Sequence, residues 1–230
     1  MIELTVLVNC FNEKNTILEA IKEAKALDID KEIIVIDNCS TDGSRELIEN
    51  LKDNSLRMVL QPKNYGAGMS AKLGIEMASG EYMYSPNADL EYRMSDVYTM
   101  LKKVKEENLD AVFGSRLLEK NMSKLRIIQE RPYALATIVA TYLINLWYKR
   151  NFTDVLGTKL IKTSILKELG VEPNNQAFEF ELVSRICKAA YRIAEVPIYY
   201  KPRSLKEGKT IRPWDMFPAL MAMLKVKLFK

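Results

Sequence analysis

The sequence predicts an α/β fold in which helices cover both faces of a mostly parallel sheet. Short apolar runs alternate with segments whose apolar residues recur at helical spacing, from residue 4 to residue 113. The chain has 230 residues, 48% of them hydrophobic and 28% charged, which is enough to bury a core without disulfides or metals. Four successive expected strands also end in polar residues, as is typical of the ligand-binding edge of such a sheet.

The first expected strand covers residues 4–8, because Leu-Thr-Val-Leu-Val is an apolar, β-rich run of the kind that lies buried in a parallel sheet. A helix is expected over residues 15–27, where apolar side chains recur at helical spacing. Residues 32–36 form the second expected strand. The following residues, 37–44, are dense in turn and capping residues and open a helix that runs to about residue 54.

The alternation continues with a third expected strand at residues 56–60. A helix opens in the segment 64–68 and ends near residue 80, where a serine and a glycine mark its end. Residues 82–84 predict a fourth strand, and a further helix is expected over residues 95–107. Strands that alternate with helices in this rhythm indicate parallel pairing with helical crossovers.

The rhythm changes after a fifth expected strand at residues 111–113. An apolar, aromatic-containing helix is then expected at residues 131–150 and an amphipathic helix at 175–190. A strand follows at 193–200, then a polar basic loop at 201–212 and a second amphipathic helix at 214–227. No run of eighteen uncharged apolar residues occurs, so a spanning helix is not expected. The chain runs from its first residues straight into a strand, so no signal peptide is expected either.

Histidine is absent, which excludes Ser-His-Asp and Cys-His catalysis and any histidine-ligated metal. The three cysteines, Cys10, Cys39 and Cys187, are odd in number and not at metal-ligand spacing, which favours a reducing, cytosolic setting. Residues 200–230 contain eight basic and two acidic residues, a net charge of +6. Since the whole chain carries +4, the other residues together carry −2. This basic end predicts contact with a membrane surface or an anionic ligand, with a merely solvated end as the alternative. No nucleic-acid partner is expected.

Polar residues at the expected strand ends are the first candidates for chemistry. Asp37 is placed to accept hydrogen bonds from a base or a ribose, although Asp37 and Asp42 are alternatively caps of the following helix. The segment Gly66–Gly68 lets backbone amides approach a diphosphate, or serves only the loop–helix junction. The polar residues of the four ends are Asn9, Asn12 and Glu13; Asp37, Asn38 and Asp42; Asn64, Gly66 and Gly68; and Asn87, Asp89 and Glu91.

The segment Asn87–Glu91 is the most informative of the four. Side chains at 87, 89 and 91 face one point if the chain stays extended, and oxygen ligands at that spacing suit Mg²⁺ or Mn²⁺ bound together with phosphates. A solvated acidic turn is the alternative, and the other polar strand ends weigh against it.

With these residues assembled, the chain resembles the family 2 glycosyltransferases of the GT-A type, and within them the polyprenyl-phosphate sugar transferases, which include the dolichol-phosphate enzymes. The resemblance covers roughly residues 4–205. It rests on motifs in order, none of which is specific alone: Val8–Glu13, Glu32–Gly43, Asn64–Gly68, Ala78–Glu81, Asn87–Glu91, Gly114–Arg116, Thr153–Leu160, and Glu195–Ile198 followed by Arg203.

The resemblance implies a GT-A type, Rossmann-like domain over residues 1–205. Residues 1–116 would bind a nucleotide sugar and residues 117–205 an acceptor, with a basic amphipathic tail over 206–230. The implied nucleotide-sugar residues are Asn9, Phe11, Glu13, Asp37, Asn38, Asn64, Gly66, Asn87, Ala88 and Asp89. The implied metal ligands for Mg²⁺ or Mn²⁺ are Asp89 and Glu91, and the implied acceptor-phosphate residues are Arg116, Arg131 and Arg203.

Two departures from the family pattern affect these assignments. Asn87 stands where the metal motif usually has Asp, and Glu91 stands where the polyprenyl-phosphate branch often has Gln. The formal charge near the metal therefore stays at −2, and the expected ligands shift to Asp89 and Glu91. Val8-Asn9-Cys10 also replaces the usual Pro-Thr or Pro-Ala, which alters the nucleotide contacts of that loop.

The acceptor decides which further groups catalysis needs. A phosphate acceptor is already an anion and needs only cations to hold it, whereas a hydroxyl acceptor needs a general base. The expected catalytic residues are Asp89, Arg116 and Arg131 for a phosphate, with Glu181 or Glu179 as base for a hydroxyl of a glycan or lipid-linked sugar. Both glutamates alternatively only stabilise the start of a helix.

The apolar stretches at residues 134–148 and 214–227 favour a polyprenyl phosphate at the cytosolic membrane face. The alternatives for these stretches are burial against the domain or a homodimer. We therefore expect an inverting transferase that uses a UDP- or GDP-sugar and lies at the membrane periphery. A nucleotide-sugar-binding protein without transferase activity is the remaining alternative.

Overall fold

A computed structural model describes residues 2–118, 134–172, 177–201, 203 and 216–229. Seven strands form one sheet. They are β1 (Leu4–Cys10), β2 (Lys31–Asp37), β3 (Leu56–Leu60), β4 (Tyr82–Tyr84), β5 (Ala111–Ser115), β6 (Lys159–Lys162) and β7 (Ile193–Pro197).

The strand order in the sheet is β3-β2-β1-β4-β6-β5-β7. Neighbouring strands pair in parallel except at β6, which runs antiparallel to both β4 and β5. The predicted α/β fold with a mostly parallel sheet is confirmed. Because all strands except β6 point the same way, their carboxyl ends gather at one edge of the sheet, and β6 begins at that edge.

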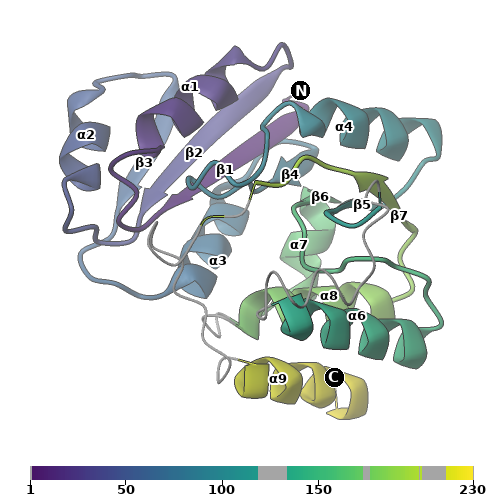
Figure 1. The fold of residues 1–230 in the computed structure, drawn as a ribbon. Coiled ribbons are helices and arrows are strands. Elements are labelled where there is room, and N and C mark those ends of the chain that lie inside the picture. The colour runs from purple at the N-terminus through teal and green to yellow at the C-terminus, as the bar shows by residue number, and fades with distance from the viewer. Residues whose placement is uncertain (1, 119–133, 173–176, 202, 204–215, 230) are drawn as a thin grey trace.

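Helices cover both faces of the sheet (Figure 1). One face carries α1 (Ile17–Ala26), α2 (Ser44–Asn50) and α4 (Asp96–Glu106). The other carries α3 (Ala67–Met77), α6 (Ala134–Tyr148), α7 (Thr163–Leu169) and α8 (Phe178–Lys188), and α9 (Met216–Phe229) packs outside α8 and α6.

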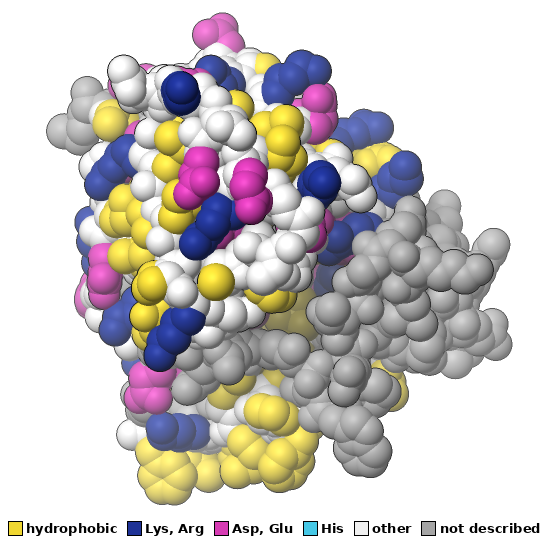
Figure 2. Space-filling model, turned by 90° about the vertical axis from the view of Figure 1, so that its left-hand side faces the viewer, with side chains coloured by type: hydrophobic (Ala, Val, Ile, Leu, Met, Phe, Trp, Pro, Cys, Tyr) yellow, Lys and Arg dark blue, Asp and Glu magenta, His cyan; other side chains and the backbone are white. Residues whose placement is uncertain are grey.

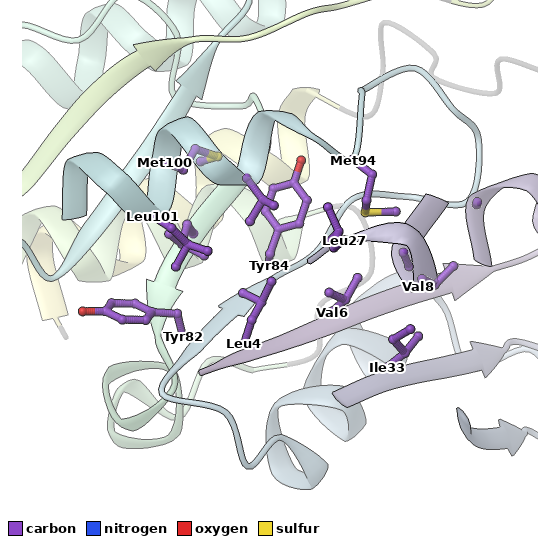
Figure 3. Packing of buried hydrophobic residues seen from close by; sticks show 14 of the residues in the cluster. Leu4, Val6, Val8, Leu27, Ile33, Tyr82, Tyr84, Met94, Met100 and Leu101 are labelled. Carbon is purple, nitrogen blue, oxygen red and sulfur yellow. The ribbon is translucent and has the colours of Figure 1, made fainter. Parts of the chain in front are cut away.

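The alternation of side chains along β1 divides the core into two layers. Leu4, Val6 and Val8 point to one face, where they pack with Tyr84 of β4 and Met100 of α4 (Figure 3). The side chain between them, Leu7, points to the opposite face and joins the cluster under α3 and α6. Both faces of β1 are therefore buried from Leu4 to Val8, as the apolar, β-rich run predicts.

Two elements were not expected, namely β6 and α7. The β6 sequence, Lys-Leu-Ile-Lys, is four residues long and passes straight into α7 with no glycine or proline between them. Nothing local therefore marks its boundaries. Its place between β4 and β5 depends on long-range pairing, in which Leu160 lies opposite both Tyr84 and Val112.

Helix α9 is apolar on two faces. Ala219, Met223 and Val226 are buried against the domain, whereas Phe217 is 71% and Leu228 60% exposed. Hydrophobic side chains gather at the end of the molecule where α9 lies (Figure 2). Within the described ranges, none of the helices combines the length and apolarity needed to cross a bilayer.

Candidate functional site

The carboxyl ends of β1, β2 and β4 lie side by side at the predicted ligand-binding edge. The Asn38 amide donates to the carbonyl of Cys10 at 2.9 Å, and Asn9 bridges Asn87 in parallel register. The Ala88 amide also donates to the Asn9 carbonyl at 3.3 Å. The side-chain oxygen of Asn9 is buried without a hydrogen-bond partner in the described part of the chain. No described residue therefore satisfies this oxygen at the ligand-binding edge.

Asp37 is completely buried at the end of β2. Its carboxylate accepts a bond from Arg45 Nε at 2.8 Å and from the Ser40 amide at 3.2 Å. The N-cap residue of α2 is Gly43, and the side chain of Asp42, just before it, accepts from the Ser44 amide at 2.9 Å. Asp37 is thus a rigidly held carboxylate whose charge is shared with Arg45.

Asn38 and Asn64 connect the loop after β2 to the start of α3. The Asn38 side-chain amide donates to Asn64 Oδ1 at 2.9 Å, and Asn38 Oδ1 accepts from the Tyr65 amide at 2.9 Å. Asn64 Oδ1 also accepts from the Gly66 amide at 2.8 Å. Gly66 has φ +85°, a conformation that favours glycine at this loop–helix junction.

Four charged side chains meet beside Asn87, and we call them the carboxylate–arginine cluster: Glu13, Asp89, Glu91 and Arg203. Arg203 Nη1 donates to the two Glu13 oxygens at 3.0 and 2.9 Å, and Nη2 donates to Asp89 Oδ2 at 3.3 Å. Arg203 Nε lies 3.9 Å from Glu91 Oε1, which accepts the Arg203 backbone amide at 2.8 Å. The structure therefore brings together residues from positions 13, 89, 91 and 203.

The cluster is largely removed from water. The side chains of Glu13, Asp89 and Glu91 are only 15%, 11% and 10% exposed. Burial raises the pKa of Glu13 above its ordinary value, the nearby Asp89 adds to that rise, and Arg203 opposes it. Among the described residues, one guanidinium faces these three carboxylates.

The donor set fits a divalent cation. Carboxylate oxygens are the ligands that Mg²⁺ and Mn²⁺ prefer, and Asp89 and Glu91 already hold a cation in the form of Arg203. Within the described residues, no three acidic or cysteine side chains are arranged to enclose a metal ion. In this arrangement the carboxylates are oriented toward the guanidinium.

Arg116 forms a second charged centre at the end of β5. Its Nε and Nη2 donate to Asp154 at 2.6 and 2.9 Å, and its guanidinium lies 5.1 Å from the ring centroid of Tyr200. Burial alone would raise the pKa of Asp154, but Arg116 outweighs burial and holds it below its ordinary value. The N–H groups of Arg116 thus bind Asp154, and the guanidinium also contacts the Tyr200 ring.

Glu195 supports this centre from β7. Its carboxylate accepts the backbone amides of Thr153 and Asp154 at 2.8 and 2.9 Å. Burial raises its pKa above the ordinary value, and hydrogen bonds from Asp154 and Thr153 counteract that rise. These bonds fix the loop that presents Asp154 to Arg116.

The two glutamates of α8 have different surroundings. Glu181 is 2% exposed and pairs with Arg185 at 2.8 Å within its own helix. Glu179 is 53% exposed at its side chain and accepts a bond from the buried Lys159 Nζ at 2.7 Å. Lys159 is the first residue of β6, so Glu179 lies at the ligand-binding edge.

Two predicted site residues remain, Phe11 and Arg131. Phe11 is 45% exposed in the loop after β1, two residues before the cluster residue Glu13. Arg131 lies outside the described residues. The pairing of Arg45, Lys159 and Asp154 with Asp37, Glu179 and Arg116 was not predicted, because these partners lie 8, 20 and 38 positions away and no local pattern marks the pairs.

Comparisons with known proteins identify the family of this chain and proteins of similar fold. A family model described as glycosyl transferase family 2 matches residues 5–170. The protein MJ0544 of Methanocaldococcus jannaschii is 24% identical over 202 residues, which cover 84% of this chain and 85% of that protein.

A poly-beta-1,6-N-acetyl-D-glucosamine synthase of Staphylococcus aureus strain MSSA476 is 33% identical over 134 residues. That match covers 57% of this chain and 32% of the synthase, so the chain spans about a third of the synthase's length.

Two solved structures share the fold. Glucosyl-3-phosphoglycerate synthase from Mycobacterium tuberculosis, in complex with Mn²⁺, UDP and phosphoglyceric acid, has a TM-score of 0.70 at 18% identity, over 99% of this chain and 79% of that one. Residues 1–349 of S. aureus TarS with UDP-GlcNAc have a TM-score of 0.64 at 16% identity, over 97% of this chain and 66% of that one.

Proposed function

The chain belongs to glycosyl transferase family 2, and from this membership we propose that it moves a sugar from a UDP- or GDP-sugar to a polyprenyl phosphate. The observation that carries the proposal is the carboxylate–arginine cluster at the carboxyl edge of the sheet, the edge that also carries the buried Asp37. Similar proteins with this fold bind UDP and UDP-GlcNAc.

We assign the donor to the edge formed by β1, β2 and β4. Asp37 would accept hydrogen bonds from the base or ribose, because its carboxylate is fixed by a strand end and by Arg45. The side-chain oxygen of Asn9, which has no hydrogen-bond partner among the described residues, would be one more acceptor. Residues contributing to the same pocket would be Phe11, Glu13, Asn38, Asn64, Gly66, Asn87 and Ala88.

Asp89 and Glu91 would hold Mg²⁺ or Mn²⁺ together with the diphosphate. A bound divalent cation would neutralise the charge that develops on the nucleoside-diphosphate leaving group. The glucosyl-3-phosphoglycerate synthase of similar fold contains Mn²⁺ with UDP, which supports this assignment.

Apolar surface beside the acceptor region supports a lipid acceptor. A cavity of about 280 Å³ next to Thr153 is lined mainly by apolar side chains of α6 and its neighbours, among them Leu117, Ile138 and Tyr142. The exposed apolar face of α9 lies on the same side of the sheet as α6 (Figure 1). A lipid that lies along these helices would bring its phosphate from a membrane surface to Arg116, whose guanidinium donates to Thr137 of α6 at 3.3 Å.

The transfer itself needs few groups from the protein. A phosphate oxygen of the acceptor would attack the anomeric carbon while the bond to the nucleoside diphosphate breaks, with inversion of configuration. The acceptor is already an anion at pH 7, so Arg116, Arg131 and Arg203 would hold it in line and no base is required. Residues 1–116 would thus serve the donor and residues 117–205 the acceptor.

The test is incubation of the protein with labelled nucleotide sugars and polyprenyl phosphate, with and without Mn²⁺. We expect a lipid-linked sugar with at least one donor, formed only when the divalent cation is present. Asp89→Asn should reduce the rate at least tenfold, and Lys72→Gln on the outer face of α3 is the matched control. If every donor fails to yield a lipid-linked product, the proposal is wrong.

Glu179 favours a second candidate function, transfer to a hydroxyl group of a glycan or a lipid-linked sugar. A hydroxyl acceptor needs a base within hydrogen-bond reach. Glu179 is the half-exposed carboxylate of α8 at the edge, whereas Glu181 is engaged by Arg185 in the interior.

Glu179→Gln separates the two acceptors. It should leave transfer to polyprenyl phosphate within about threefold of the wild-type rate, but nearly abolish transfer to a hydroxyl. Nucleotide-sugar binding with neither transfer nor hydrolysis would instead indicate a binding protein without catalytic activity.

A further inference from the structure

We propose that Arg203 is a tethered counter-ion that exchanges with the divalent cation. Its guanidinium would neutralise the carboxylate–arginine cluster before the cation binds, and would leave the cluster when the cation arrives. The inference rests on the proposed use of Mg²⁺ or Mn²⁺, but it concerns the order of occupation of the site, which the reaction alone does not specify.

The guanidinium and a divalent cation compete for the same oxygens. Arg203 Nη2 donates to Asp89 Oδ2 at 3.3 Å, and Arg203 Nε lies 3.9 Å from Glu91 Oε1. These are the two carboxylates assigned to the cation. A guanidinium within hydrogen-bond distance of a metal ligand would also repel a divalent cation bound to that ligand.

The guanidinium is held incompletely. Arg203 Nε is buried and has no hydrogen-bond partner in the described part of the chain, and its nearest carboxylate oxygen is 3.9 Å away. A buried donor without a partner weakens the bound state, so removal of the side chain from the cluster costs less than loss of a fully bonded guanidinium. The contact is therefore suited to exchange.

The backbone leading to Arg203 is anchored independently of its side chain. The Lys201 amide donates to the Glu91 carbonyl at 2.8 Å, and the Tyr200 ring packs on Tyr92 with centroids 5.4 Å apart. The residue before Tyr200 is also held, because the guanidinium of Arg93 lies 3.7 Å from the centroid of the Tyr199 ring. Residues 199–201 can thus stay in place while the side chain at 203 moves, which keeps the arginine close to the diphosphate.

Direct Mn²⁺ binding tests the exchange without nucleotide, acceptor or turnover. We would titrate the full chain with Mn²⁺ and follow the loss of the free-ion signal by electron paramagnetic resonance. Arg203→Gln should bind Mn²⁺ at least tenfold more tightly than the wild type, because the competing charge is gone. Arg203→Lys should fall between them. Arg57→Gln removes an arginine paired with Glu32, away from the cluster, and should bind like the wild type.

A thermal-unfolding measurement completes the test. Without Mn²⁺, Arg203→Gln should unfold at a lower temperature than the wild type, since Glu13, Asp89 and Glu91 lose the guanidinium that they face. Saturating Mn²⁺ should raise its midpoint more than that of the wild type. If Arg203→Gln does not fold without metal, the same comparison is made with Arg203→Lys. Equal or weaker Mn²⁺ binding by the variants, or no binding by any of them, would overturn the exchange. Failure of sugar transfer alone would contradict the proposed function and leave these binding results standing.

Discussion

Asp37 and Arg45 form an ion pair whose partners differ sharply in exposure. The Asp37 side chain is fully buried, whereas that of Arg45 is 25% exposed and also donates to the Gln61 carbonyl. A buried charge that loses its partner is costly, whereas a partly exposed guanidinium can turn to water. The two halves of the pair are therefore not equivalent.

Removal of Arg45 should destabilise the protein more than removal of the Asp37 charge. We expect Arg45→Gln to lower the free energy of unfolding by about 3 kcal/mol and Asp37→Asn by about 1.5 kcal/mol. The double variant should show a coupling of about 1–2 kcal/mol. Urea unfolding at pH 7 measures all three values. An equal cost for both single variants would show that burial of Asp37 does not dominate this pair.

Glu195 should make stability depend on pH. Its pKa is raised in the folded protein, chiefly by burial, so the folded state keeps this proton to a higher pH than the unfolded chain does. The stabilisation from this proton is present below the ordinary carboxyl pKa and is lost as the pH rises through the raised value. The unfolding free energy of the wild type, relative to Glu195→Gln, should therefore fall as the pH rises from 4 toward neutrality.

Urea titrations of the wild type and Glu195→Gln across this range give that difference. Glu19→Gln on the exposed side of α1 reports the background, since its partner Lys22 is also exposed. A difference that stays constant or grows with pH would contradict the assigned direction.

Single residues of the site differed in how far the sequence could predict them. Asp37, Asp89 and Glu91 follow strands, and the structure gathers them at one edge because parallel strands end together. The pairing of Arg203 with Glu13 joins residues 190 positions apart, so no local pattern could indicate it. Whether these residues bind donor and metal stays a prediction.

Among the elements, the loop before β6 depends on Gly157. A Cβ at this position would lie 1.8 Å from the carbonyl oxygen of Gly114, which is backbone and cannot turn aside. The same loop carries Asp154, the partner of Arg116. Its conformation therefore requires glycine for close approach.

Gly157→Ala should lower the free energy of unfolding by about 3 kcal/mol or more, because the loop must leave the end of β5. Gly170→Ala is the matched control. Gly170 has φ +55° at the end of α7 and meets no atom closer than 3.9 Å, so alanine there should cost only about 1 kcal/mol. Urea unfolding of both variants checks the contrast. Equal costs would mean that the loop at residue 157 relaxes without leaving β5.

The alternating strands and helices in the first half of the chain were predictable, because apolar residues form short runs in the strands and recur at helical spacing in the helices. The helix expected over residues 95–107 is α4, and the strand expected over 4–8 is the core of β1. The antiparallel β6 was missed, because its four residues are too short to show a period. Long-range pairing with β4 and β5 determines its place.

For the whole molecule, the exposed apolar side chains of α9 predict a membrane contact. Phe217, Met221, Leu224 and Leu228 are spaced so that they share one face of the helix, and all are at least 38% exposed. Figure 2 shows hydrophobic side chains concentrated at this end of the molecule. A lipid acceptor would require this end to lie on a membrane.

Replacement of Phe217, Met221 and Leu228 by serine should weaken binding to vesicles of anionic lipid at least tenfold, because each buried apolar side chain contributes about 1.5–3 kcal/mol. The thermal midpoint should stay within about 2 °C of the wild type, since these side chains are exposed. Leu18→Ser on α1, at the opposite end of the molecule in Figure 1, should change neither quantity.

Co-sedimentation with vesicles measures binding, and analytical ultracentrifugation of the same samples reports oligomers. If the triple variant binds vesicles as the wild type does but converts a dimer to a monomer, this face is a contact between two copies. The acceptor would then have to reach the Arg116 centre by another surface.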